Sequence, residues 1–220
     1  MPRIVNFGSV NIDHVYGVPH FVQPGETLAS ASYRCFPGGK GLNQSLALAR
    51  AGARVAHAGR IGADGLWLRD LLTLEGVDTS GLRVAAEPTG HAILQVTPDG
   101  ENAILLHGAA NDNIDHEDAA RIIQGCQDDD ILLLQNEISS MPHILALAAE
   151  RELPVVLNPA PMSDAVLSYP LENVRLLIVN EIEAACFVGD LPPGAMLQAL
   201  RKRFEKAHIV LTLGNRGVLA

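Results

Sequence analysis

The amino-acid sequence predicts an α/β fold in which helices cover both faces of a mainly parallel central sheet. Two observations lead to this prediction. Short apolar runs alternate along the chain with segments of helical periodicity, as expected for repeated strand–helix units. The runs are also apolar throughout, which is typical of strands that are buried on both faces. With 220 residues, 48% of them hydrophobic, the chain can build one compact core.

Six strands and six helices are predicted in alternation. The strands are short and rich in β-branched residues or leucine, and they comprise Ile4–Phe7, Val55–Ile61, Ile131–Gln135, Val155–Asn158, Leu176–Val179 and Ile209–Leu213. The helices comprise Lys40–Ala51, Leu66–Glu75, Asp118–Cys126, Pro142–Glu150, Glu181–Val188 and Met196–Lys206. The second helix is the clearest, because its leucines recur at helical spacing and Gly76 follows directly.

Two segments interrupt this alternation, residues 14–35 and 89–106. Both carry β-like residues and Pro/Gly turns but no helical period. The second predicts a hairpin of Ala92–Thr97 and Asn102–His107 around the turn at residues 98–100. We expect the two insertions to form a small sheet that stands apart from the main one and can cover a site as a lid.

The chain ends within a predicted element. Residues 209–220 predict a strand, a glycine-containing turn and the start of a further strand at Val218. We therefore expect the C-terminal part of the fold to be missing from this sequence. On this interpretation residues 1–220 form one incomplete α/β domain with the lid strands inserted into it.

Charge and cysteine content argue against several classes of function. The net charge is −9 with a pI near 5.3, whereas nucleic-acid binding needs a basic surface. The three cysteines are far apart and odd in number, which argues against a disulfide framework and for a reducing compartment. No signal-peptide pattern and no apolar run of membrane-spanning length are present. We expect a cytoplasmic protein without nucleic-acid or membrane partners.

The glycine-rich segment at residues 37–44 is the strongest candidate for a binding site. Its glycines allow close approach of a ligand to the backbone and leave amide groups free at a helix start. Lys40 at that start opposes the helix dipole, so it needs a partner such as a sugar oxygen or a transferring phosphate. Asn43 lies three residues later on the same helical face. The alternative is an ordinary glycine turn, and the segment is neither a Walker A loop nor a dinucleotide fingerprint.

Polar residues also follow two of the predicted strands. Asn11 and Asp13 come after the first strand, and in extended chain two residues so spaced face the same way. Glu137 follows the strand that ends at Gln135. Ligands of open α/β sheets bind beyond the carboxyl ends of the strands, where these groups are expected. They could hold vicinal hydroxyls, although an ordinary Asx turn at Asn11 is the alternative.

These motifs resemble those of the PfkB family of carbohydrate kinases, and within it the ribokinase group. The segment PGGKGLNQSLALARAGARVAHAGRIGADGLW is similar to the first signature of that family. The shorter blocks GSVNID, PGET, HGAAN, LNPAP, NEIEA and TLGNRGV occur in the order expected for that group. The likeness extends over the whole chain.

The resemblance implies a ribokinase-like three-layer fold with a small β lid, and ATP-dependent phosphorylation of a sugar hydroxyl, with a pentose such as ribose as substrate. The residues implied in sugar binding are Asn11, Asp13, Gly39, Lys40, Asn43 and Glu137. Those implied near the nucleotide are Asn180, Glu183, Thr212, Gly214 and Gly217. Glu183 would organise Mg²⁺ through water, the alternative being a solvated helix carboxylate. The lid strands imply a homodimer.

One departure from the family pattern bears on activity. The second signature, a GAGD-like turn that supplies an anion hole and the catalytic base, is absent from these 220 residues. A loop for a monovalent cation such as K⁺ would also lie outside them. We therefore expect the chain as given to lack kinase activity, with no catalytic residue of its own.

Other readings of the sequence stay open. The chain could be a sugar-binding fragment or a decayed paralogue without catalytic function. It could also belong to a PfkB kinase for a nucleoside, a fructose phosphate or a keto-deoxy sugar acid. Asn11, Asp13 and Asn43 favour a neutral polyhydroxylated sugar, because a phosphorylated substrate would require further cations near these motifs.

Overall fold

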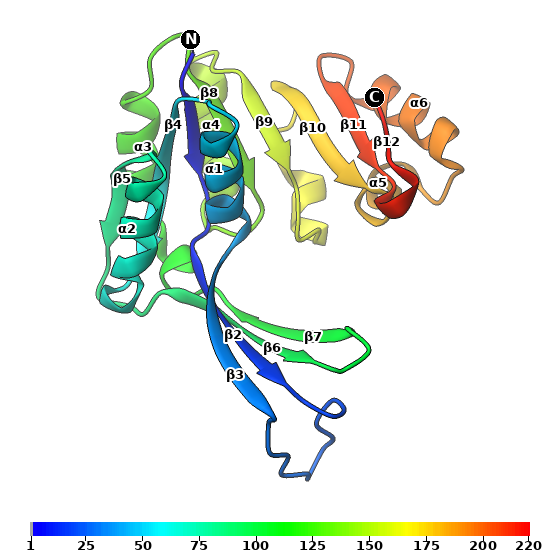
Figure 1. The fold of residues 1–220 in the computed structure, drawn as a ribbon. Coiled ribbons are helices and arrows are strands. Elements are labelled where there is room, and N and C mark those ends of the chain that lie inside the picture. Colours follow the sequence, from blue (N-terminus) through cyan, green and yellow to red (C-terminus); the bar gives the residue numbers. More distant parts are fainter. Residues whose placement is uncertain (1) are drawn as a thin grey trace.

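An eight-stranded sheet forms the centre of the molecule, and a four-stranded sheet projects from one end of it (Figure 1). The computed structural model describes residues 2–220. The main sheet has the order β12-β11-β10-β9-β8-β1-β4-β5. Its strands are β1 (Ile4–Phe7), β4 (Val55–Ile61), β5 (Asp78–Val84), β8 (Ile131–Gln135), β9 (Val155–Asn158), β10 (Val174–Asn180), β11 (His208–Thr212) and β12 (Val218–Leu219). Its pairs are parallel except β11 with β12, which is antiparallel.

Helices cover both faces of this sheet and give the predicted three layers. They are α1 (Lys40–Arg50), α2 (Leu66–Leu74), α3 (His116–Gln124), α4 (Met141–Glu150), α5 (Glu181–Val188) and α6 (Pro193–Arg203). Leucines of α1 and α2 pack with β4 and β5 in one hydrophobic cluster. Buried residues of the other four helices pack in a larger cluster against the opposite face. The sheet is therefore covered as its apolar strands predicted.

Six strands and six helices lie where the sequence predicted them, with ends displaced by at most three residues. One strand of the main sheet, β5, was not predicted. Its sequence mixes polar and apolar residues, and its burial alternates because it lies at the edge of the sheet beside β4. It pairs with β4 in parallel through residues such as Leu82 opposite Gly59. A half-exposed edge strand lacks the continuous apolar run that marks the central strands.

The small sheet consists of β3 (Ser32–Gly38), β2 (Asn11–Gly17), β6 (Gly90–Val96) and β7 (Asn102–His107), in that order. It combines the two inserted segments, as predicted, and β6 and β7 form the expected hairpin. β2 begins at Asn11, three residues before the predicted boundary at 14, and β3 ends at Gly38, three residues after the predicted boundary at 35. As a result Asn11 and Asp13 belong to β2 itself and not to a turn before it.

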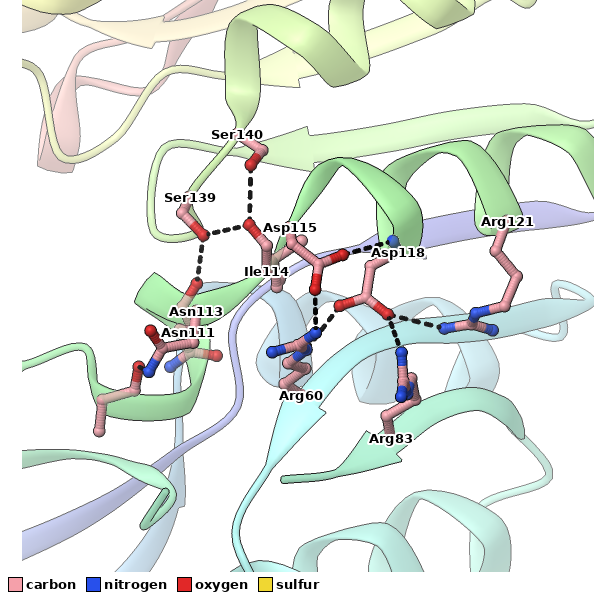
Figure 2. Close-up of polar contacts among 11 residues, drawn as sticks. Arg60, Arg83, Asn111, Asn113, Ile114, Asp115, Asp118, Arg121, Ser139 and Ser140 are labelled. Atoms are coloured by element: carbon pink, nitrogen blue, oxygen red, sulfur yellow. Dashed lines mark hydrogen bonds and ion pairs between the residues drawn. The ribbon is translucent and has the colours of Figure 1, made fainter. Parts of the chain in front are cut away.

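An ionic cluster fixes α3 to the edge of the main sheet (Figure 2). Asp118 is buried, and its carboxylate accepts hydrogen bonds from Arg60 on β4 at 2.5 Å, from Arg83 on β5 at 2.8 Å and from Arg121 at 3.3 Å. Asp115 caps the helix by accepting from the Asp118 amide, and it also binds Arg60. Burial acts to raise the pKa of Asp118, but the hydrogen bonds from Arg83, Arg121 and Arg60 together with the charge of Arg60 outweigh it and lower the pKa.

No helix within residues 2–220 is both long and apolar enough to cross a membrane.

Candidate functional site

The six residues implied in sugar binding surround one cavity of about 250 Å³. The cavity lies where the small sheet meets the carboxyl ends of β1 and β8. Its polar wall comprises Asn11, Asp13, Gly39, Lys40, Asn43 and Glu137. Its apolar wall comprises Ala92 and Leu94 of β6, Ile104 and Leu106 of β7, and Pro161. Segments more than 120 residues apart in sequence therefore converge on one cavity, to which the small sheet contributes both polar residues of β2 and apolar residues of β6 and β7.

Glu137 connects the polar residues of this wall. Its Oε2 atom accepts hydrogen bonds from Ser9 Oγ at 2.6 Å and from the Lys40 amide at 2.8 Å, while Oε1 accepts from Lys40 Nζ at 2.8 Å. The Glu137 side chain is only 7% exposed, whereas the Lys40 side chain is 38% exposed, so it is the carboxylate of this ion pair that is shielded from water. The partner that the lysine needs is therefore a carboxylate of the protein. The sequence predicted that Lys40 needs a partner, and gave a sugar oxygen or a phosphate as examples; in the free protein that partner is Glu137.

The start of α1 is held by Gly39 and Ser9. Gly39 precedes the helix with φ of +90°, a conformation that residues with a Cβ atom rarely adopt. Ser9 Oγ accepts from the Gly41 amide and its carbonyl accepts from the Leu42 amide. Two of the free amides at the helix start are thus satisfied by Ser9, while the Lys40 amide is satisfied by Glu137. Ser9 was not among the predicted site residues, although it lies in the GSVNID block.

Asp13 is the second carboxylate at the cavity. Burial raises the pKa of Asp13, and the nearby Glu137 carboxylate raises it further. His14 and Lys40 act in the opposite direction but do not cancel these effects. A carboxylate that is poorly solvated and faces another negative charge gains most from hydroxyl groups that donate to it. This arrangement suits a neutral ligand rich in hydroxyls.

Asn11 is almost completely buried, and a second asparagine holds it. Asn111 Nδ2 donates to Asn11 Oδ1 at 2.8 Å and to the Val10 carbonyl at 3.2 Å. Asn111 Oδ1 accepts from the Val10 amide at 3.1 Å. Asn111 lies in the HGAAN block, yet nothing in the sequence indicated a contact with residues one hundred positions earlier.

A buried polar network lies beneath the helix start. Asn6 Nδ2 donates to the Gly41 carbonyl at 2.7 Å and to Ser45 Oγ at 2.8 Å. Ser45 Oγ lies 2.8 Å from His57 Nδ1, and Gln135 Nε2 donates to Asn6 Oδ1 at 2.9 Å. Burial lowers the pKa of His57 to about 4, so the ring is neutral at pH 7. The network connects β1, β4 and β8 to the first turns of α1 and fixes the base of the site.

The residues implied near the nucleotide lie at the carboxyl ends of β10 and β11, away from the cavity wall. Asn180 caps α5, where its Oδ1 atom accepts from the Glu183 amide at 2.8 Å, and the Glu183 carboxylate accepts from the Asn180 amide at 3.0 Å. This reciprocal pair is a capping box. Glu183 is thus buried and bound to the helix start, so the alternative of a solvated helix carboxylate is wrong.

Thr212 is the last residue of β11, and Gly214 and Gly217 lie in the turn that follows it. Thr212 lies opposite Asn180 in the parallel register, which brings the two groups of residues together at one edge. Gly214 and Gly217 have φ values of +58° and +93°. The five residues implied near the nucleotide are therefore neighbours in the structure.

Within the described residues 2–220, no three or more His, Cys, Asp and Glu side chains are grouped so that they could hold a metal ion. A Mg²⁺ ion at the β10–β11 edge would therefore depend on oxygen ligands from a bound substrate and from water, with Glu183 as the nearby carboxylate. Mg²⁺ commonly binds in this way, through one or two carboxylates together with substrate phosphates. Both Glu183 oxygen atoms already accept hydrogen bonds from Asn180, so Glu183 could bind such an ion directly only if the capping box opened.

Comparison with known proteins decides the family. The family model described as pfkB family carbohydrate kinase matches residues 1–220. The chain belongs to the PfkB family of carbohydrate kinases. A ribokinase from Haemophilus influenzae is 37% identical over 229 aligned residues, which cover 96% of this chain and 72% of that protein. The present chain therefore matches about 72% of the length of this relative.

Solved structures of PfkB proteins share the fold. A ribokinase from Cryptococcus neoformans in complex with ADP matches 100% of this chain and 75% of its own, with 34% identity and a TM-score of 0.81. The Arabidopsis thaliana ribokinase complexed with ribose and ATP matches 99% of this chain and 73% of its own, with 27% identity and a TM-score of 0.80. The predicted fold class, a ribokinase-like α/β fold with a mainly parallel sheet, is confirmed.

Proposed function

We propose that this protein provides the sugar site of an ATP-dependent pentose kinase, with ribose as the preferred substrate. The observation that supports this most is the convergence of Asn11, Asp13, Lys40, Asn43 and Glu137 on one cavity. Carboxylates accept from sugar hydroxyls, whereas the asparagine amides and the lysine donate to sugar oxygens. The apolar residues of β6 and β7 that line the same cavity would contact the carbon face of a sugar ring.

The charges at the cavity favour a neutral sugar over a phosphorylated one. Among the described residues that line it, Lys40 is the single cation, and it is already paired with Glu137. Asp13 adds a second carboxylate. A fructose phosphate or a sugar acid would bring negative charge next to two carboxylates without a free cation, which is electrostatically unfavourable. We therefore expect the site to prefer a pentose to these charged substrates.

The reaction would transfer the γ-phosphoryl group of ATP to a primary hydroxyl of the sugar. A bond forms between the hydroxyl oxygen and the γ-phosphorus as the bond to ADP breaks, and the hydroxyl proton passes to a base. Asn180, Glu183, Thr212, Gly214 and Gly217 would hold the nucleotide, and Mg²⁺ near Glu183 would offset phosphate charge. The small sheet would close over the sugar and exclude water, so that water does not accept the phosphoryl group instead.

The base itself is expected outside these residues. The family places it in a GAGD-like turn, and no such turn occurs in the 220-residue sequence. Phosphoryl transfer depends on positioning and on charge stabilisation, both of which this turn supplies. We propose that the 220-residue chain binds the sugar but turns it over negligibly. The same turn would adjoin the K⁺ loop, so no residue described here is proposed to bind K⁺.

Isothermal titration calorimetry with D-ribose, D-fructose, fructose 6-phosphate and adenosine tests the substrate. We expect ribose to bind most tightly and Asp13→Asn to weaken it strongly, while the exposed loop variant Asp99→Asn binds normally. Binding of none of the four ligands, or tighter binding of the phosphorylated sugar, would contradict the proposal. A phosphorylation assay with ribose and ATP that gave ordinary rates would contradict the expected loss of turnover.

The small sheet also suggests a homodimer. Its cavity-side face carries exposed apolar side chains, among them Phe36 at 43%, Ile104 at 58% and Leu106 at 46% exposure. A second groove on the same face, lined by Val15 and Phe36 among others, continues this surface toward the tip of the sheet. Exposed apolar surface of this kind commonly marks an interface. We propose that two copies pair through this face.

A further inference from the structure

Asn111 couples the two sides of the candidate sugar site, and its orientation has a consequence for the chemistry of the cavity. Its side chain binds the backbone of Val10 and the side chain of Asn11, at the point where the chain enters the small sheet. Its carbonyl accepts from the Ser139 amide at 3.0 Å and from Ser139 Oγ at 3.3 Å, as Figure 2 shows for the hydroxyl. Ser139 lies two residues after Glu137. One buried residue therefore joins the segments that carry Asn11 and Glu137.

The orientation of the Asn111 amide is fixed by backbone groups. The Val10 amide can only donate and the Val10 carbonyl can only accept, so Oδ1 of Asn111 must face the amide and Nδ2 the carbonyl. The second hydrogen of Nδ2 then points to Asn11, which must present its Oδ1 atom in return. The usual ambiguity between the oxygen and nitrogen of a side-chain amide is thus removed at both residues.

The consequence concerns the group that Asn11 turns toward the ligand. Because Asn11 Oδ1 is occupied by Asn111, its Nδ2 group remains. Within residues 2–220 this group donates to no acceptor, and it is not among the fully buried atoms that lack a partner, so it reaches solvent. Asn11 lines the cavity together with Asp13. The cavity therefore presents a donor from Asn11 beside an acceptor from Asp13. This pair complements two neighbouring hydroxyls, one that accepts and one that donates.

Gly90 supports the same arrangement. It lies opposite Asn11 in the pairing of β2 with β6. A Cβ atom at this position would come within 2.1 Å of Asn111 Nδ2 and 2.3 Å of Asn11 Oδ1. A side chain at residue 90 would therefore separate the two amides, and the direct contact requires glycine here.

We propose that Asn111 is a positioning residue that fixes the Asn11 amide with its NH₂ group toward the sugar. The inference rests on the proposed function only for the identity of the ligand. The hydrogen-bond orientation itself is a property of the free protein. Asn111 would touch no reacting atom and would act through Asn11 alone.

Replacement of Asn111 by aspartate reverses the arrangement. In Asn111→Asp a carboxylate oxygen can still accept from the Val10 amide, but no group remains that donates to Asn11 Oδ1. Asn11 is then expected to rotate, so that its NH₂ group donates to the new carboxylate and its oxygen faces the cavity. The ligand would meet two neighbouring acceptors, Asn11 and Asp13. We expect ribose affinity to fall about 10- to 100-fold, the usual loss when a buried polar group is left mispaired.

Nuclear magnetic resonance of the ¹⁵N-labelled 220-residue protein tests this directly. The side-chain NH₂ signals of Asn11 are assigned from their loss in Asn11→Asp. We expect them to shift when D-ribose is added to the wild-type protein, and to be displaced already in free Asn111→Asp and unresponsive to ribose there. Asn113→Asp is the matched control, because Asn113 lies in the same turn but donates only to the Ala109 carbonyl at 3.3 Å. It should leave both the Asn11 signals and the ribose affinity unchanged.

A second variant covers the case in which a buried carboxylate prevents folding. Asn111→Ser adds no charge and also lacks a donor that reaches Asn11, so it too should abolish the ribose-induced shift. Wild-type Asn11 signals and wild-type ribose affinity in either folded variant would overturn the inference. If Asn111→Asp displaces the Asn11 signals but wild-type protein does not respond to ribose, the positioning role holds and the proposed sugar substrate fails.

Discussion

At the scale of single residues, Glu137 determines how the candidate site is held in the absence of a ligand. Three donors from Ser9 and Lys40 converge on its two oxygen atoms. Position after a strand was enough to single out Glu137 and Asp13 from the sequence, because the carboxyl ends of parallel strands meet at one edge. Lys40 was singled out by the glycine-rich helix start that it opens. Their mutual pairing was not foreseen, since a sequence does not show which lysine faces which carboxylate.

We predict that Glu137→Gln weakens both folding and ribose binding. The glutamine keeps the size of the side chain but leaves the Lys40 cation without its counter-charge and places an NH₂ group among donors. Loss of charged hydrogen bonds of this kind costs about 1–3 kcal/mol. We expect the free energy of unfolding, measured with urea, to fall by that amount, and ribose affinity in calorimetry to fall at least about tenfold.

Glu172→Gln is the control for this prediction, because Glu172 is exposed and lies far from the cavity wall. It should leave the urea midpoint and the ribose affinity unchanged. A Glu137→Gln protein with wild-type values for both quantities would show that the ion pair with Lys40 has no role in the site.

Two residues of the site, Ser9 and Asn111, were not predicted, although both lie in blocks that the family resemblance singled out. Asn111 approaches Asn11 across one hundred residues of chain. Ser9 satisfies amides of a helix that begins more than thirty residues later. Such contacts depend on how the strands cross at the base of the small sheet. Motif spacing carries information about neighbours along the chain, and not about these crossings.

At the scale of elements, the attachment of α3 to the sheet edge shows what pattern analysis leaves out. The start of this helix was predicted at Asp118, two residues late, because the cap at Asp115 was not recognised. The neighbouring strand β5 was also missed, since it is polar on its exposed side. Both elements depend on the arginine cluster around Asp118. Local propensity alone does not specify contacts of this kind.

We predict that Asp118→Asn strongly destabilises the protein. The Asp118 side chain is 3% exposed, and its negative charge is paired with the guanidinium groups of Arg60, Arg83 and Arg121, as Figure 2 shows. Removal of one partner from a buried ionic cluster typically costs about 3–5 kcal/mol, and the partial exposure of Arg83 and Arg121 places this case near the lower figure. Urea denaturation measures the loss. Glu117→Gln, an exposed carboxylate in the same helical turn, should have little effect.

A third prediction concerns His57, which lies in the polar network beneath α1. Its pKa is about 4 in the folded protein and about 6.5 when exposed. The unfolded chain therefore binds one more proton than the folded one between these values. Stability from this group is fully present above pH 6.5 and is lost as the pH falls toward 4. The loss amounts to about 3 kcal/mol.

Urea denaturation of the wild type and of His57→Gln between pH 7 and pH 4 isolates this contribution, because glutamine does not titrate. The difference in unfolding free energy between the two proteins should shrink by about 3 kcal/mol over that interval. The exposed His208 provides the control, since His208→Gln should follow the wild-type curve. Parallel curves for the wild type and His57→Gln would contradict a buried neutral histidine.

At the scale of the whole molecule, the covering of the main sheet by helices on both faces could be predicted, because each central strand is a continuous apolar run. The small sheet was predicted from a different signal. Its two segments carry β-like residues and turns but lack a helical period. The sequence did not reveal which of its faces turns to the cavity. That choice follows from the register of β2, which places Asp13 opposite Ala92 and Phe36 on one face. The same face carries the exposed apolar residues of the proposed dimer.

The final prediction tests that dimer with a pair of adjacent residues. Successive residues of a strand point to opposite faces, so Ile104 lies on the cavity side and Leu105 on the outer side of β7. Both are well exposed, at 58% and 68%. A lysine at residue 104 would place a charge within the proposed interface, whereas one at residue 105 would remain in water. Sedimentation equilibrium of the two variants therefore distinguishes the faces directly.

We expect the wild-type protein and Leu105→Lys to sediment as dimers, and Ile104→Lys to dissociate to monomers at the same concentration. The physical reason is the cost of burying an unpaired ammonium group, which exceeds the gain from the remaining apolar contacts. A wild-type monomer, or a dimer that only Leu105→Lys disrupts, would contradict pairing through the cavity-side face. Because Ile104 also lines the cavity, loss of the dimer in Ile104→Lys should be accompanied by weaker ribose binding, whereas Leu105→Lys should retain both properties.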